Sequence, residues 1–148
     1  MTAATAIDPL ALESQVCFAL AVASRRVIAE YRPLLEPMGL THPQYLVMLA
    51  LWQAEPLSVR RLGELVSLEP ATLSPLLKRL EVQGFLHRQR RTDDERTLDV
   101  TLTEEGRALR ERALAIPPAM MARLGLTVEE LQGLHALLTD VIARTKDP

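Results

Sequence analysis

The chain has 148 residues and a formal net charge of −2, a length that fits a single domain. Apolar residues make up 48% of it, but few are aromatic, so leucine, valine and alanine must build the core, a mix that favours helices. The only cysteine is Cys17, which excludes an intramolecular disulfide framework. A slightly acidic chain is not typical of a nucleic-acid binder unless its charges are segregated.

The N-terminal segment predicts a tail rather than a targeting signal. It has neither the basic stretch nor the apolar run of a signal peptide. No apolar run approaches the roughly 20 residues that a membrane-spanning helix needs. We therefore expect a flexible tail over residues 1–9, a single domain over residues 10–148, a cytoplasmic location and no membrane partner.

The first expected helix runs from about Leu10 to Leu35. Residues 16–23 are apolar in every direction around this helix, rather than along one stripe. A helix that is apolar all round must be buried all round, and in a chain this small a second copy of the chain is the natural cover. Residues 10–35 are therefore predicted to form a dimerisation helix.

Residues 103–146 are expected to supply the other dimerisation helices. Thr103 is a helix N-cap followed by two glutamates, which suit the positive end of a helix. The prolines at 117 and 118 break this helix. Thr127 and Glu130 form a capping box for a last helix with apolar residues three and four positions apart.

The central segment, residues 58–102, predicts two short helices followed by a hairpin. Thr41 and Gln44 make a capping box for a helix that precedes this segment. Ser58 caps the first short helix, and Pro70 opens the second, which Gly84 ends. The residues expected to face the core are Leu62, Leu65 and Val66 in the first helix and Leu73, Leu76, Leu77 and Leu80 in the second.

The outward face of the second short helix has the residue types of a DNA-reading helix. Its early turns present small and hydroxyl side chains, and cations follow. This order suits a helix whose N-terminal end enters the major groove while later turns meet phosphate. The face is centred on Ala71, Pro75 and Lys78 and flanked by Thr72, Ser74 and Arg79.

The hairpin adds a second basic element. Between Lys78 and Arg91 there are five lysines or arginines and one glutamate. Arg88 and Arg90 share one face of the first strand, Arg91 follows them, and Arg96 lies at the base of the tip formed by residues 92–95. Taken singly, such charges can be a solvated surface. Together, the helix pair and basic hairpin predict a winged helix–turn–helix, in a mainly α fold, that binds double-stranded DNA with a steep salt dependence.

The cysteine permits two interpretations. A lone cysteine in an apolar helix is usually an inert core residue, and reactivity needs nearby donors or positive charge. Tyr31 is 14 residues away, about 21 Å along a straight helix, so it can reach only the Cys17 of another subunit. His42 lies at the N-terminus of its helix, where the helix dipole favours the neutral imidazole over the charged imidazolium. The three histidines, His42, His87 and His135, are scattered along the sequence and with one cysteine do not make a zinc site. No metal or organic cofactor is expected.

Several blocks of residues resemble the MarR family of dimeric winged-helix regulators, and within it the one-cysteine organic hydroperoxide resistance regulators. The resemblance implies a repressor on a pseudo-palindromic operator, with Cys17 oxidised by an organic hydroperoxide and supported by Tyr31 of the other subunit. The blocks are residues 15–20, 31–36, 43–46, 72–81 and 93–96.

The chain departs from the family pattern at three places. Ala21 and His42 stand where the family commonly has tyrosines. Ala21 cannot donate a hydrogen bond, whereas His42 can replace its tyrosine beside Cys17, so Cys17, Tyr31 and His42 are the candidate redox-sensing residues. Glu69-Pro70-Ala71 replaces a frequent Asp-Ser-Gly. Because no second cysteine exists, oxidised Cys17 either forms a mixed disulfide with a small thiol or proceeds to irreversible states. Two alternatives remain: a repressor released by an aromatic or lipophilic ligand with Cys17 inert, and a thiol peroxidase. The interpretation favoured here is a regulator, not an enzyme.

Overall fold

The computed structural model describes residues 8–145 and is mainly helical, as expected, with one small sheet. Within this range no helix is both long and apolar enough to cross a bilayer. The elements are η1 (Leu12–Ser14), α1 (Val16–Leu35), η2 (Glu36–Met38), α2 (His42–Gln53), β1 (Leu57–Ser58), α3 (Val59–Val66), α4 (Pro70–Val82), β2 (Leu86–Arg90), β3 (Leu98–Leu102), α5 (Glu104–Ala113), α6 (Ile116–Leu124) and α7 (Val128–Arg144).

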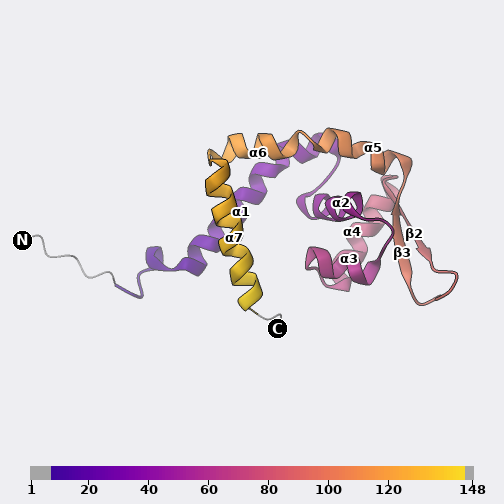
Figure 1. Ribbon diagram of the computed structural model, residues 1–148, viewed down its shortest axis with the longest axis horizontal. Helices are drawn as coiled ribbons and strands as arrows, with labels where there is room; N and C mark the ends of the chain where they lie inside the picture. The colour runs from indigo at the N-terminus through magenta and orange to yellow at the C-terminus, as the bar shows by residue number, and fades with distance from the viewer. Residues whose placement is uncertain (1–7, 146–148) are drawn as a thin grey trace, which may run out of the picture.

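The elements divide the molecule into two regions, which α5 and α6 join along the top of Figure 1. The region at the right holds α2, α3, α4 and the β2–β3 hairpin. The region at the left holds α7 and the N-terminal part of α1, and α1 packs against α6. We call the first the reader region (residues 40–103) and the second, formed by α1 and α7, the helical frame (residues 16–35 and 128–144).

The first long helix starts later than expected. α1 begins at Val16, after the short η1 turn and an extended Gln15. The side-chain amide of Gln15 donates to the carbonyls of Pro9 at 2.8 Å and Ala11 at 3.0 Å. Because a side chain occupies these acceptors, the backbone does not need to continue the helix there, and the expected start at Leu10 was wrong. The predicted tail lies mostly outside the described residues.

The helix starts that were predicted from capping residues are confirmed. Thr41 and Thr127 each form a capping box, with Gln44 and Glu130. The Ser58 and Thr103 side chains accept hydrogen bonds from backbone amides of α3 and α5. The expected break separates α5 from α6, but it lies at residues 114 and 115, and the paired prolines stand in the first turn of α6. These local rules worked because each cap depends on residues three positions apart.

The core of the reader region is built largely from the leucines of α4. Leu73, Leu77 and Leu80 are fully buried, whereas Leu76 is half-buried at the edge of the same stripe. In α3, Leu62 is fully buried but Leu65 is 47% exposed, so its predicted inward position was wrong. Leu65 points about 60° to one side of Leu62 in a helix of eight residues and faces solvent.

The sheet fixes the hairpin to this core. Its strands are antiparallel in the order β1-β3-β2, with Arg88 opposite Val100. Val100 is fully buried. At the base of the hairpin, a Cβ added to Gly106 would lie 2.0 Å from the carbonyl oxygen of Phe85. The indole of Trp52 donates to the Gly106 carbonyl at 2.8 Å, so α2, α5 and the hairpin meet at a glycine.

The helical frame leaves apolar surface open. α7 contains no fully buried residue, and α1 buries only Leu35 at its far end. A single chain therefore does not cover the apolar faces that the sequence predicts to be buried. The large apolar side chains exposed on these two helices are Val16, Phe18, Leu20, Ile28, Val128, Leu134, Leu137, Val141 and Ile142.

Candidate nucleic-acid interface and cysteine site

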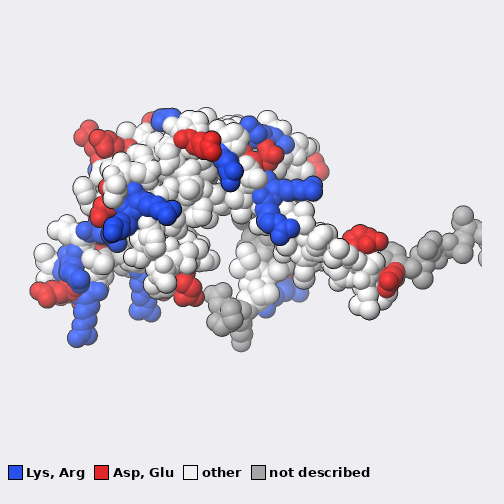
Figure 2. All heavy atoms as spheres, turned by 180° about the vertical axis from the view of Figure 1, so that it is seen from behind, with Lys and Arg blue, Asp and Glu red and all other residues white. Residues whose placement is uncertain are grey.

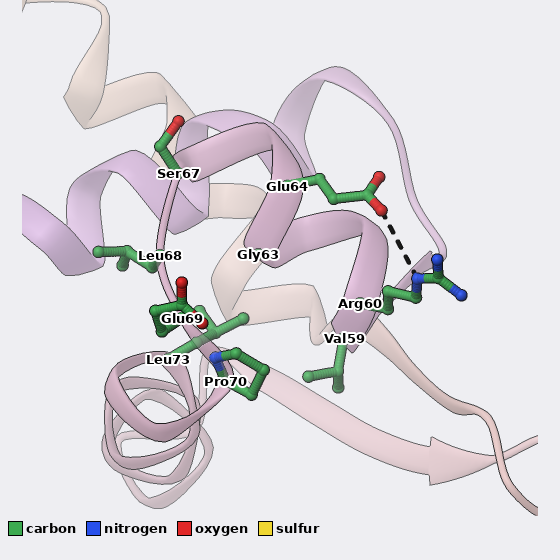
Figure 3. A pocket seen from close by; sticks show the side chains of 9 residues that line it. All are labelled: Val59, Arg60, Gly63, Glu64, Ser67, Leu68, Glu69, Pro70 and Leu73. Atoms are coloured by element: carbon green, nitrogen blue, oxygen red, sulfur yellow. Dashed lines mark ion pairs between the residues drawn. The ribbon is translucent and has the colours of Figure 1, made fainter. Parts of the chain in front are cut away.

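A tight turn sets α4 against α3. Ser67 adopts the left-handed conformation with φ of 55°, and the Leu68 amide donates to the Gly63 carbonyl at 3.0 Å. A Cβ on Gly63 would approach the Leu68 oxygen to 3.0 Å, so glycine permits this close return of the chain. Figure 3 shows the resulting groove of about 500 Å³, with Arg60 at its α3 side and Glu69 at the start of α4.

The face of α4 that the sequence predicts to point outward is exposed in the structure. Glu69 is the N-cap, its side chain makes no capping hydrogen bond, and Pro75 is accommodated inside the helix. Within residues 8–145 no ion pair involves Lys78 or Arg79. The face thus offers hydroxyls near its start and cations further along. Its exposed residues are Ala71, Thr72, Ser74, Pro75, Lys78 and Arg79.

The predicted wing arginines have different environments. Arg88 is half-buried and turns back onto α4, where its backbone amide donates to Glu81 at 2.9 Å and its guanidinium pairs with the same carboxylate at 3.4 Å. These hydrogen bonds, the backbone one first, lower the pKa of Glu81. Arg88 therefore joins strand to helix, and the sequence alone did not show this because its partner lies across the Gly84 turn.

The remaining three arginines are exposed along the wing. Arg90 donates to the Glu95 carbonyl at 2.8 Å, and Arg91 pairs with Asp99 at 2.9 Å. Arg96 contributes its backbone amide to Asp94 and leaves its side chain in solvent. Each guanidinium keeps donors that can face a phosphate, because five N–H groups exceed the contacts that the structure shows.

The wing tip is organised from within. The Asp94 carboxylate accepts a hydrogen bond from the Thr97 hydroxyl at 2.8 Å and another from the Arg96 amide at 3.1 Å. These donors, the Thr97 hydroxyl first, lower the pKa of Asp94. The Asp94 carboxylate thus shapes the loop that carries Arg96. In Figure 2, where the reader region lies at the left, basic side chains project from this region although the net charge of the chain is negative.

The predicted redox residues do not meet within one chain. Cys17 is exposed near the start of α1, and Tyr31 lies in the last part of the same helix. The Tyr31 ring instead packs on His42 and on Tyr45, with centroid distances of 4.9 and 5.8 Å. Any approach of Tyr31 to a cysteine needs another subunit, as the helix spacing predicted.

Burial sets the acid–base properties of this aromatic cluster. It raises the pKa of Tyr31 and of Tyr45, the latter also through the charge of Tyr31, and it lowers the pKa of His42. All three groups are therefore neutral at pH 7, so the phenols can donate hydrogen bonds. Tyr45 was not among the predicted site residues, although its spacing of three from His42 already put both on one face of a helix.

The helix pair with its tight turn, the exposed face of α4 and the two-stranded wing define a winged helix–turn–helix DNA-binding regulator. Residues 40–98 match the family model described as "MarR family". The chain belongs to the MarR family.

Relatives over most of the chain support this assignment. The organic hydroperoxide resistance transcriptional regulator of Bacillus subtilis is 41% identical over 131 residues, covering 88% of this chain and 89% of its own. The crystal structure of AbfR of Staphylococcus epidermidis is 32% identical, covers 90% and 95% of the two chains and has a TM-score of 0.72. A structure of reduced AbfR bound to DNA is 33% identical, covers 89% and 92%, and has a TM-score of 0.74.

Proposed function

We propose that the protein is a homodimeric transcriptional repressor that releases its operator when an organic hydroperoxide oxidises Cys17. One observation carries the proposal most directly: Cys17 is exposed on the apolar part of α1 that a single chain leaves uncovered. A second subunit on that face brings other side chains to the thiol. The similar regulator from Bacillus subtilis is named for organic hydroperoxide resistance.

The DNA half of the proposal rests on the reader region. Two copies of α4 in a dimer enter successive major grooves, so the operator is a pseudo-palindrome in double-stranded DNA. Thr72 and Ser74 read base edges, while Lys78 and Arg79 meet phosphate. The wing arginines follow the minor groove, and Arg88 holds the wing against α4 through Glu81. Such a regulator acts in the cytoplasm, where the DNA is.

The redox half is a two-electron transfer at sulfur. The Cys17 thiolate attacks the outer peroxide oxygen, the O–O bond breaks, and a proton completes the departing alcohol. The sulfur is oxidised to a sulfenic acid and the hydroperoxide is reduced. A small thiol then condenses with the sulfenic acid, forming a mixed disulfide and water. Tyr31 and His42 of the other subunit supply the hydrogen-bonding surroundings that favour the thiolate.

Two other functions make different predictions. A repressor released by an aromatic or lipophilic ligand requires no chemistry at Cys17, and a thiol peroxidase requires no operator. The exposed face of α4 and the wing favour a regulator over the peroxidase, because catalysis at Cys17 has no use for them. The relative of this chain in Bacillus subtilis is named as a transcriptional regulator, and the chain matches the MarR family model.

The test is the response of Cys17→Ser to an organic hydroperoxide. We expect native protein to lose operator binding after treatment with cumene hydroperoxide, and Cys17→Ser to bind the operator before and after treatment. Ser24→Ala, an exposed change on the same helix, is the control and should release like the native protein. Release of Cys17→Ser at the native peroxide concentration would contradict the redox proposal and favour a ligand-released repressor.

A further inference from the structure

A short chain of hydrogen bonds ties the far end of α4 to the first turn of α2. The side-chain amide of Gln83, the C-cap of α4, donates to the carbonyl of Gly39 at 2.6 Å. Its oxygen accepts from the side-chain amide of Gln44 at 3.3 Å. Gln44 in turn accepts from the backbone amide of Thr41 at 2.9 Å. These side chains connect residues about 40 positions apart in the sequence.

Gln44 is unusual in this molecule. It is only 4% exposed, and within residues 8–145 no other polar or charged side chain is buried apart from the phenol of Tyr45. A buried amide is stabilised only when its donors and acceptor are satisfied. The Gln44 oxygen serves the capping box of α2, which leaves its amide group for Gln83. One buried side chain thus fixes both the start of α2 and its bond to α4.

The first turn of α2 also carries the contact with α1. His42 and Tyr45 pack on Tyr31, whereas Gln44 lies about 200° around the helix from His42. One face of this turn therefore contacts Tyr31 of α1, and another contacts Gln83 at the end of α4. Gly39, which accepts the bond from Gln83, lies in the link between α1 and α2 with φ of 72°.

The geometry points to Gln83 and Gln44 as positioning residues that transmit displacements of His42 and Tyr31 to the DNA-reading helix. This inference rests on the proposed function, because it assigns the link between the cysteine site and α4. A shift of the first turn of α2 pulls on the C-terminal end of α4 through two side-chain bonds. The groove of about 530 Å³ between the two elements is lined by Lys78 and Arg79, so the same movement reaches groups that face DNA.

Gln83→Leu tests the link through the ratio of operator Kd values after and before cumene hydroperoxide. Leucine is close in size but can neither donate to Gly39 nor accept from Gln44. We expect this ratio to fall about five- to tenfold relative to the native protein. Gln83→Glu keeps the acceptor but loses the donor to Gly39, so its Kd ratio should fall by a similar factor. Gln53→Leu, at the exposed end of α2, is the matched control and should keep the native ratio.

A double-mutant cycle separates this link from the redox proposal, because it is measured on reduced protein without peroxide. His42→Gln and Gln83→Leu should change operator Kd non-additively, with the double variant differing by about threefold or more from the product of the single changes. If peroxide releases the native protein from its operator, an unchanged ratio in Gln83→Leu overturns the link. A multiplicative cycle overturns the link whether or not the native protein responds to peroxide. If native protein ignores peroxide but the cycle is non-additive, the redox proposal fails and the link stands.

Discussion

The reader region and the helical frame differ in how far one chain completes them. In the reader region, each helix from α2 to α4 buries leucines or other apolar side chains that are at most a few per cent exposed. In the helical frame, α7 buries none of its residues and Leu137 is 64% exposed. The reader region can hold its shape within one subunit, whereas the frame requires a second. A change in how two frames fit together can therefore move two intact readers.

The sequence predicted helix starts and the buried stripe of α4 better than it predicted side-chain hydrogen bonds, for a physical reason. Caps such as Thr41 and the leucine spacing of α4 depend on neighbours within one or two turns, so local patterns contain the information. The late start of α1 depends on a hydrogen bond from Gln15, and the bridge from Gln83 to Gly39 spans 44 positions. The Gln83 contact follows from tertiary placement, and the Gln15 contact is a local side-chain hydrogen bond. The periodicity of apolar residues encodes neither.

The candidate site shows the same division. The exposed face of α4 followed from the position of its buried leucines, since the two faces of one helix exclude each other. The pairing of Arg88 with Glu81 and the packing of Tyr45 on Tyr31 could not be read in that way. Both contacts join residues of different elements across a turn or between helices.

The largest expected effect disturbs the close contact between α5 and the base of the hairpin in the reader region. Gly106→Ala places a methyl group against the Phe85 carbonyl and disturbs the Trp52 hydrogen bond. We expect a loss of about 3 kcal/mol in the free energy of unfolding, at the upper end for overpacking. Chemical denaturation at fixed protein concentration measures it. Gly133→Ala, where a Cβ meets nothing within 4 Å, should cause no loss; equal losses in both variants would refute the packing explanation.

A charge on the frame should separate the subunits while leaving each reader folded. Leu137→Glu on α7 should give monomers and weaken operator binding about 100-fold, because two linked readers bind better than one. Analytical ultracentrifugation and operator titration measure the two effects. Leu114→Glu, where the leucine is 53% exposed between α5 and α6, is the matched control. A dimeric Leu137→Glu protein would show that α7 does not form the interface.

Substitutions within the reader region should distinguish phosphate contact from base reading. Arg96→Ala should weaken binding about five- to tenfold on every duplex and lower the salt slope by about one. Ser74→Ala should change the preference among duplex sequences more than the slope. Fluorescence anisotropy at several salt concentrations measures both. If native protein binds matched and scrambled duplexes equally, the base-reading role of α4 is wrong.

The smallest expected effect is on the pH dependence of folding stability, through His42 between α1 and α2. Burial lowers the pKa of His42 below its usual 6.5, so between that lowered value and 6.5 the unfolded chain binds more protons than the native protein. Stability is then full above about pH 6.5 and falls as the pH drops through this window. His42→Gln should flatten that fall in denaturation experiments between pH 7 and 5. His135→Gln on α7 should retain it, and identical profiles for native protein and His42→Gln would contradict the assignment.

The most direct test follows Cys17 and operator occupancy in the same sample. Native protein on its operator is titrated with an organic hydroperoxide, and DNA footprinting is read alongside the intact mass of the protein. We predict that protection disappears in proportion to the fraction of chains that gain an oxygen, or a small thiol when one is present, at Cys17. Full protection with Cys17 completely oxidised, or lost protection with Cys17 still reduced, would contradict the proposed function.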